Sequence, residues 1–214
     1  VVADARWRVV SWGGGWGGAP ARPAEGVRAG AGKGAPGYSA RETGAGGPAT
    51  GFGRVIVAGL VLAAIGDVAL IPKHRQAFLV GLVAFLLGHV AYAVAFVELG
   101  IDATVTGVAG LAMACAAALV LRWLWPHVER PMRAPVLAYV AVITVMVALA
   151  LGAAAHSGAW LLAAGGVAFY LSDLAVARER FVARGFINRA WGLPLYFFAQ
   201  MLLASQAGLG AAAH

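Results

Sequence analysis

The chain has 214 residues, of which 61% are hydrophobic and only 12% are charged. Soluble domains carry roughly 25% charged residues, so this composition excludes an ordinary soluble domain and indicates an integral membrane protein. The formal net charge of +7 is not evidence of nucleic-acid binding, because basic residues in short loops between apolar stretches follow from membrane topology. The single cysteine, Cys115, cannot form an internal disulfide and is expected to be a small buried apolar side chain.

The N-terminal segment differs from the rest of the chain. Runs such as WGGGWGGAPARPAEG combine Gly, Pro and Arg without apolar periodicity. Such a segment cannot bury enough apolar surface to offset its ordering entropy, so residues 1–52 are expected to form a disordered low-complexity tail. The segment is not a secretory signal, since no apolar stretch follows its early basic residues. Residues 53–210 are expected to form the folded part.

Six apolar stretches follow, each long enough to cross a hydrocarbon core, which takes about 17 to 25 residues. They are Val55–Ile71, Ala77–Val97, Thr104–Leu121, Ala134–Ala155, Gly158–Ala177 and Ala190–Leu209. Short loops join them, and several of these loops contain Pro or Gly. The sequence therefore predicts an all-α fold, a polytopic transmembrane bundle with six spans.

Lysine and arginine gather in every second loop between these stretches. The basic loops contain Lys73 and Arg75, then Arg122, Arg130 and Arg133, then Arg178, Arg180, Arg184 and Arg189. The loops at 98–102 and 155–158 contain none. The positive-inside rule places the three basic loops in the cytoplasm, with the bundle in the inner (plasma) membrane of the cell.

Two aspartates, Asp67 and Asp173, lie inside spans that are otherwise apolar. A charged side chain near the bilayer centre costs roughly 2.5 to 3.5 kcal/mol on insertion scales, so an intramembrane acid indicates a functional site by default. Each aspartate is followed by a basic loop, so the two acids are expected at similar depths in the cytoplasmic half. Asp67 and Asp173 are the candidate catalytic residues.

Other polar side chains in the spans are spaced to share helix faces with one another. They are His89 and Tyr92, Tyr196 and Gln200, and Tyr170 three residues before Asp173. Lipid offers no hydrogen-bond partner, so these faces should point into the bundle and line one polar pocket that opens toward the cytoplasm. They are candidate substrate-binding or supporting residues.

Structural roles remain open for the same residues. The tyrosines, Tyr139 included, are also suited to be interface anchors or packing residues, Gln200 an interhelical contact and His89 a satisfied buried histidine. Each aspartate also suits a structural ion pair with a nearby Arg or Lys. Two acids and one histidine are possible metal ligands in principle, but their spacing matches no known ligand pattern. No metal or cofactor is expected.

The run GDVALIPKHRQAFLVGLVAFLLGHVAYAVAF resembles the YhhN-like membrane family, whose better-known animal members are lysoplasmalogenases. The family has a GDxxL run, then a phenylalanine-led span that ends in a His-x-x-Tyr pair. These features are matched by the residues Gly66, Asp67, Leu70, Phe78, His89 and Tyr92. Its later SD run is matched by Ser172 and Asp173, and its closing Tyr and Ala-Gln run by Tyr196 and Gln200. The resemblance covers residues 53 to about 208.

Two features depart from the family pattern. Family members usually have about eight spans, so two N-terminal helices are missing here, and the Gly/Pro/Arg-rich tail stands in their place. We interpret this tail as the product of a misplaced start or a reading-frame shift, which recovery of the upstream coding DNA would test.

The resemblance implies hydrolysis of the vinyl ether bond of a lysoplasmalogen, which yields a fatty aldehyde and a glycerophospho-alcohol. Protonation of the β-carbon of a vinyl ether gives an oxocarbenium ion that water attacks, as in glycoside hydrolysis by paired carboxyl groups. One of Asp67 and Asp173 is expected to donate the proton, and the other to stabilise the cation and orient water. Lys73, Arg75 or Arg178 at the pocket mouth is a candidate for the lipid phosphate, although topology alone also explains these residues.

Two other function classes compete with this interpretation. In a proton-coupled transporter or a lipid-binding membrane protein, the acids would bind a cation or couple proton movement. In a purely structural bundle, the aspartates would serve only folding. The sequence does not identify the head group of a natural substrate or the oligomeric state.

Overall fold

The computed structural model describes residues 51–72 and 74–209, and all regular structure in this part of the chain is helical. The six long helices are α1 (Gly51–Leu70), α2 (Arg75–Leu99), α3 (Ala103–Leu124), α4 (Arg130–Ser157), α5 (Trp160–Ala177) and α6 (Phe186–Ser205). A short 3-10 turn, η1 (Trp125–His127), follows α3, and a π-helical turn, η2 (Arg178–Val182), follows α5. The predicted disorder of residues 1–50 lies outside the described residues, whereas Gly51 and Phe52 are already helical.

Five helices are long and apolar enough to cross a membrane. They are Gly51–Leu70, Arg75–Leu99, Ala103–His127, Arg130–Ser157 and Trp160–Val182. The chain is therefore an integral membrane protein. The sixth predicted span corresponds to α6, which has 20 residues but is not among these five, so its crossing remains a prediction.

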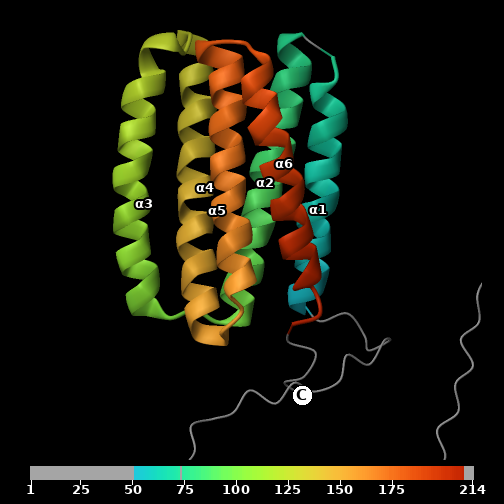
Figure 1. The fold of residues 1–214 in the computed structure, drawn as a ribbon, viewed down its shortest axis with the longest axis vertical. Coiled ribbons are helices and arrows are strands. Elements are labelled where there is room, and N and C mark those ends of the chain that lie inside the picture. The colour runs from blue at the N-terminus through green and yellow to red at the C-terminus, as the bar shows by residue number, and fades with distance from the viewer. Residues whose placement is uncertain (1–50, 73, 210–214) are drawn as a thin grey trace, which may run out of the picture. The chain divides into compact units, whose positions relative to one another are not determined.

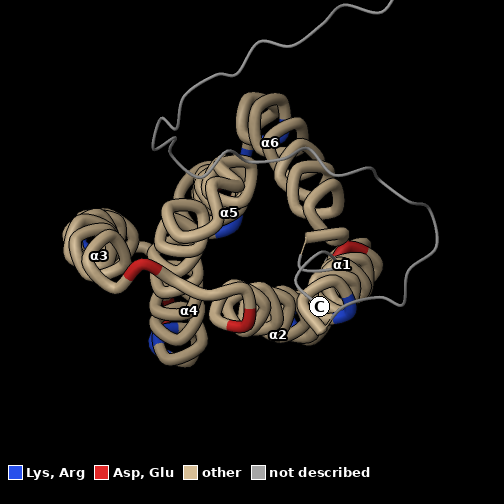
Figure 2. Tube along the Cα trace, turned by 90° about the horizontal axis from the view of Figure 1, so that it is seen from below, with Lys and Arg blue, Asp and Glu red and all other residues tan. Residues whose placement is uncertain are grey.

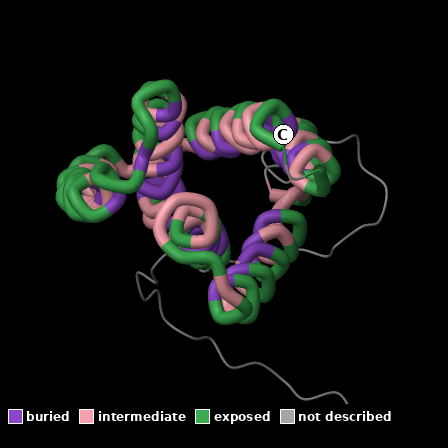
Figure 3. The backbone as a smooth tube through the Cα atoms, turned by 90° about the horizontal axis from the view of Figure 1, so that it is seen from above, coloured by how far each residue is buried: buried purple, intermediate pink, exposed green. Residues whose placement is uncertain are grey.

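Five of the helices form a ring, and one lies outside it. Seen along the bundle, α2, α1, α6, α5 and α4 surround a central region, while α3 lies beside α4 on the outside (Figure 2). Neighbouring helices pack closely around the ring except at the seam between α1 and α6, which touch at few places. Buried residues face the inside of the ring, and exposed residues face outward (Figure 3).

Glycines bring α1 and α2 close together. A Cβ atom built on Gly59 would overlap the Tyr92 ring, and one on Gly66 would lie 2.7 Å from the Phe85 ring. Small residues drive helix association in membranes because they allow such close approach. The ends of the helices are set by capping, as where the Asp102 carboxylate accepts a hydrogen bond from Val105 N at 2.8 Å and starts α3.

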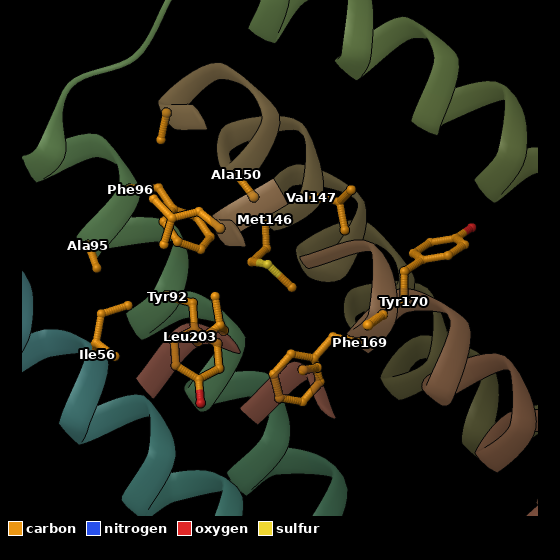
Figure 4. Close-up of a cluster of buried hydrophobic side chains, with 14 of the residues drawn as sticks. Ile56, Tyr92, Ala95, Phe96, Met146, Val147, Ala150, Phe169, Tyr170 and Leu203 are labelled. Atoms are coloured by element: carbon orange, nitrogen blue, oxygen red, sulfur yellow. The ribbon is translucent and has the colours of Figure 1, made fainter. Parts of the chain in front are cut away.

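The main core lies between the helices of the ring. Tyr92, Phe96, Met146, Phe169 and Leu203 from α2, α4, α5 and α6 meet there (Figure 4). Cys115 is not part of a core. Its exposure corrects the expectation of a buried side chain, because α3 lies outside the ring and contacts mainly α4.

The loops 71–74, 125–129 and 178–185 lie at one end of the bundle, and the loops at 100–102 and 158–159 lie at the other (Figure 1). The three basic loops therefore share one end, as the alternation of Lys and Arg predicted. Which side of a membrane this end faces remains a prediction.

Candidate active site

A cavity of about 740 Å³ lies on the inner side of the helices, toward the end that carries the basic loops. Its polar lining includes Asp67 of α1, Asp173 of α5, Tyr139 of α4 and Tyr196 of α6, set among apolar side chains. The two predicted catalytic aspartates, 106 positions apart in the sequence, thus line the same cavity. A concave, mostly apolar site with a few converging polar groups is typical of small-molecule binding.

Asp67 is the end point of a chain of hydrogen bonds. Its Oδ2 atom accepts a hydrogen bond from the Tyr196 hydroxyl at 2.7 Å. The Tyr196 oxygen accepts one from Gln200 Nε2 at 2.7 Å, and Gln200 Oε1 accepts one from the Tyr92 hydroxyl at 3.1 Å. Every hydrogen in this relay, Tyr92–Gln200–Tyr196–Asp67, points toward the carboxylate. The relay therefore presents Asp67 to the cavity in a fixed orientation.

The relay links three helices whose polar faces were expected to line one pocket, although the sequence did not predict which residues pair. Tyr92 is on α2, Gln200 and Tyr196 are one turn apart on α6, and Asp67 is on α1. Its last bond crosses the seam between α1 and α6. Tyr92 and Gln200 are not among the cavity-lining residues, so they act on the cavity only through Tyr196.

Asp173 has a different set of neighbours. Its Oδ2 atom accepts a hydrogen bond from the Tyr139 hydroxyl at 2.8 Å and lies 3.7 Å from His89 Nε2. The His89 side chain is 2% exposed and the Asp173 side chain 18% exposed, so the pair is largely shielded but open to the cavity on the aspartate side.

The hydrogen bond on the other side of His89 determines which ring nitrogen carries a hydrogen. Nδ1 lies 2.7 Å from the backbone oxygen of Phe85. A carbonyl oxygen only accepts, so Nδ1 must donate, and in the neutral ring Nε2 is left as an acceptor. Nε2 makes no other hydrogen bond in the described part of the chain, and it faces Asp173. His89 Nε2 thus faces the Asp173 carboxyl group as an acceptor, 3.7 Å away and without a hydrogen bond between them.

An aromatic cluster lies between the relay that ends at Asp67 and the His89–Asp173 pair. The ring of Phe169 packs against His89 at 5.2 Å, Tyr92 at 5.7 Å and Tyr196 at 5.7 Å between centroids. Its ring is 1% exposed. Phe169 therefore excludes water from the region between the relay and the His89–Asp173 pair.

Tyr170 and Ser172 do not join either group. The Tyr170 side chain points away from Tyr92 and Phe169 (Figure 4), and its hydroxyl has no hydrogen-bond partner in the described part of the chain. The Ser172 hydroxyl donates to the Phe169 carbonyl of its own helix at 2.9 Å. Both residues line the cavity.

The basic residues at the mouth of the cavity differ from those predicted. The lining contains Arg180, Arg184 and Arg189, and it contains neither Arg75 nor Arg178. Arg178 instead donates a hydrogen bond to Asn188 Oδ1. Lys73 lies outside the described residues. Arg75 and Arg178, which the sequence suggested as candidate phosphate ligands at this mouth, therefore do not line the cavity, and other arginines do.

Sequence reasoning also missed Tyr139 and Asn188. Tyr139 was considered only as an anchor or packing residue, because no polar residue shares its helix face and its partner is on another helix. Asn188 is 1% exposed and contacts Arg178, Glu179 and Ala183. An asparagine between the arginines at the start of the last helix was the only available signal.

Known proteins resemble this chain at moderate identity. It is 35% identical over 149 residues to a lysoplasmalogenase of Mycobacterium bovis, which covers 67% of this chain and 55% of the relative. It is 35% identical over 158 residues to human lysoplasmalogenase TMEM86A, and 34% over 160 residues to the Bos taurus protein of that name, with 71% of this chain and 64% of either relative covered. The chain thus spans between about half and two thirds of the length of the curated relatives it matches. No solved structure matches it.

The family model extends over most of the chain. It matches residues 38–207 and so includes both aspartates, the whole relay and the His89–Asp173 pair. The chain therefore belongs to the YhhN family.

Proposed function

We propose that the protein is a membrane-embedded ether hydrolase that cleaves the vinyl ether bond of a lysoplasmalogen. The products would be a fatty aldehyde and a glycerophospho-alcohol. The observation that carries this proposal is the placement of Asp67 and Asp173, from helices distant in sequence, on one cavity of an apolar bundle. Lysoplasmalogenase relatives in the same family support the substrate class.

The chemistry needs an acid, a water molecule and a stabilised cation. A proton is added to the β-carbon of the vinyl ether, and the resulting oxocarbenium ion is attacked by water at the α-carbon. The water loses a proton to a base, and the hemiacetal collapses to aldehyde and alcohol. One water is consumed, and the acid is restored by the proton that the base removed. Paired carboxyl groups perform such acid and base steps in glycoside hydrolysis.

We assign the proton-donating role to Asp173. This assignment is supported by its neighbour His89, whose Nε2 atom is free to exchange a proton with the carboxyl group 3.7 Å away. The proton that Asp67 removes from water would return to Asp173 through the cavity that both carboxyl groups line. Tyr139 holds Asp173 Oδ2 and leaves Oδ1 to the substrate.

Asp67 is then the base that orients the attacking water and stabilises the cation. Its Oδ2 atom is occupied by Tyr196, and the exposed Oδ1 atom can accept from water in the cavity. Gln200 and Tyr92 hold the Tyr196 hydroxyl in place. Tyr170, with its unpartnered hydroxyl, and Ser172 are supporting residues of the cavity wall.

We further propose that α6 crosses the membrane as a sixth span and that the basic loops face the cytoplasm from the inner membrane. The close packing of α6 along α5 supports a sixth crossing. The clustering of the arginines at one end of the bundle supports the orientation.

The test measures aldehyde release from a lysoplasmalogen by the purified full-length chain and by the Asp67→Asn and Asp173→Asn variants. Acid or base catalysis contributes typically 10²–10⁴-fold, so each variant should lose at least about 100-fold in kcat. The matched control is Asp102→Asn, which makes the same chemical change away from the cavity at a helix N-cap where asparagine also serves.

Full activity in either variant would remove that aspartate from the mechanism. Proton-coupled solute uptake into vesicles without turnover of any lipid would favour a transporter instead.

A further inference from the structure

Arg180 lies at the mouth of the cavity. An aromatic ring contacts its guanidinium group, and no carboxylate of the described residues forms an ion pair with it. Arg180 Cζ lies 4.5 Å from the centroid of the Phe78 ring, and both side chains line the cavity. Its Nε atom is buried and has no hydrogen-bond partner in the described part of the chain. A guanidinium stacked on an aromatic face still has its N–H groups directed outward in its own plane, where they can bind a planar or tetrahedral oxyanion.

Positive charge exceeds negative charge at this mouth. Arg180, Arg184 and Arg189 line it, and Glu179 is the one acidic residue beside them in the lining. Glu179 Oε2 already accepts hydrogen bonds from Gly185 N at 2.8 Å and from Asn188 Nδ2 at 2.7 Å. Within residues 51–72 and 74–209, none of the three arginines forms an ion pair. The Glu179 carboxylate interacts electrostatically with Arg184 and Arg189, whereas Arg180 is not among its charged neighbours and is the arginine most available to an anionic ligand.

The orientation of Arg180 depends on the π-helical turn η2, which is anchored by a buried amide. Asn188 accepts a hydrogen bond from Arg178 and donates to Glu179 Oε2 and to the Ala183 carbonyl, both at 2.7 Å. π-Helical turns are rare and frequently occur at functional sites. The turn holds Arg178 against Asn188 on one side and leaves Arg180 on the cavity side.

The distance from Arg180 to Asp173 fits the dimensions of a lysophospholipid. Arg180 follows Asp173 by seven residues, about 10 Å along a helix. In a lysoplasmalogen, seven bonds separate the phosphorus from the vinyl β-carbon, and extended chains advance about 3.3–3.6 Å per three bonds, so the two atoms lie about 8 Å apart.

We propose that Arg180, assisted by Arg184 and Arg189, is the binding site for the phosphate of a glycerophospholipid head group. With the phosphate on Arg180, the reactive carbon reaches the depth of Asp173. The site selects ether lipids that carry a phosphate over neutral ether lipids. This reach to Asp173 rests on the proposed function, whereas phosphate binding at Arg180 does not.

A binding experiment tests the phosphate site without requiring catalysis. The full chain in detergent micelles is titrated with a saturated 1-O-alkyl lysophosphoethanolamine, which has no vinyl ether to cleave, and with the 1-O-alkylglycerol of the same chain length. Hydrogen bonds to charged groups contribute about 1.5–3 kcal/mol, so Arg180→Gln should weaken binding of the phosphate lipid by at least about tenfold and leave the neutral lipid unchanged.

Two further variants complete the design. Arg184→Gln changes an exposed side chain at the same mouth and should weaken binding of the phosphate lipid by a smaller factor. This variant tests the site if Arg180→Gln fails to fold. Arg122→Gln removes an exposed arginine that does not line the cavity and should bind both lipids as the unmodified chain does.

Equal affinity of the unmodified chain for both lipids would overturn the proposal, as would equal weakening of both lipids in Arg180→Gln. Displacement of the phosphate lipid by millimolar inorganic phosphate alone would identify a free-phosphate site and overturn the head-group assignment.

Kinetics then separate this proposal from the proposed function. With lysoplasmalogen, Arg180→Gln should raise KM at least about tenfold, and the ratio of kcat/KM for lysoplasmalogen to kcat/KM for a phosphate-free 1-O-alkenylglycerol should fall by at least about tenfold. If the unmodified chain releases aldehyde from neither substrate, the proposed function is contradicted. The binding experiment alone then decides whether the phosphate site exists. Cleavage of both substrates with equal kcat/KM by the unmodified chain would contradict phosphate selection and leave the hydrolase intact.

Discussion

The two aspartates of this chain are held by tyrosine hydroxyls from different helices. Tyr196 donates to Asp67 and Tyr139 donates to Asp173, each at under 3 Å. A hydroxyl can hold one carboxyl oxygen and leave the other free, which a salt bridge to arginine would not, since a guanidinium tends to bind both oxygens. The aspartates are thus fixed in position while each keeps an oxygen for chemistry.

The relay to Asp67 can be tested by a double-mutant cycle. Tyr196→Phe removes the hydroxyl that contacts the carboxylate, and Gln200→Leu removes the amide that holds this hydroxyl. Tyr196→Phe should lower kcat by about tenfold or more, since hydrogen bonds to a charged group contribute about 1.5–3 kcal/mol.

Gln200→Leu should lower kcat by a smaller factor, because its effect passes through Tyr196. Residues of one network are not additive, so the double variant should be no slower than Tyr196→Phe alone. If the fold-losses of kcat in Tyr196→Phe and Gln200→Leu multiply in the double variant, the two residues act independently and the relay is contradicted.

At the scale of the helices, most of the spans were predictable and the contacts between them were not. Apolar stretches and their breakers predicted six helices, and the structure has them with ends shifted by up to four residues in either direction, as where α6 runs from Phe186 to Ser205 rather than from Ala190 to Leu209. Arg189, which precedes the predicted start of the last span, lies in the first turn of α6. A basic residue is tolerated there because the first turn of a spanning helix lies at the membrane interface. Sequence spacing also placed Tyr196 and Gln200 on one helix face, which the hydrogen bond between them confirms.

Contacts between residues on different helices depend on the rotation of each helix about its axis and on its depth in the membrane. The spacing of residues along one helix determines neither of these. For this reason the contact of Asp173 with Tyr139 could not be predicted, nor could the inward direction of Arg180 after a π-helical turn. The aspartates themselves were predictable because a carboxyl in lipid is costly wherever it points.

Helix packing supports the relay through Gly59, and this gives a second test. A methyl group on Gly59 would overlap the Tyr92 ring, which would have to move away from Gln200. Gly59→Ala should therefore lower the free energy of unfolding by about 1–3 kcal/mol, as overpacking does, and should also lower kcat.

The matched control for Gly59→Ala is Gly107→Ala on α3, where the methyl group meets no atom within 4 Å. This variant should be as stable as the unmodified chain or more stable by up to about 1 kcal/mol, because alanine favours the helix. Thermal unfolding and aldehyde release measured on both variants would check the pair. Equal behaviour of the two variants would show that the contact of Gly59 with Tyr92 is unimportant.

At the scale of the whole molecule, the proposed chemistry and the proposed orientation depend on the same end of the bundle. The arginine-lined mouth lies there, so the orientation determines which leaflet supplies the lipid. Phosphates of that leaflet lie at the membrane surface, and the aspartates lie deeper in the bundle, so a lysophospholipid can bind without leaving its ordinary depth.

Sidedness can be measured by labelling single cysteines. In a Cys115→Ser background, Ala103→Cys places a thiol at the end opposite the basic loops, and Glu129→Cys places one beside them; both positions are exposed. In intact cells, a membrane-impermeant maleimide should label the Ala103→Cys variant directly and the Glu129→Cys variant only after permeabilisation. The reverse pattern would place the mouth on the outer leaflet.

The seam between α1 and α6 has one further consequence. Little packing holds these helices together, and the bond from Tyr196 to Asp67 crosses between them. The hydrogen bond between Tyr196 and Asp67 is therefore one of the few contacts that close the ring at this point. In the proposed mechanism, protonation of Asp67 would weaken its hydrogen bond to Tyr196, and α1 and α6 would then have little else in contact across the seam.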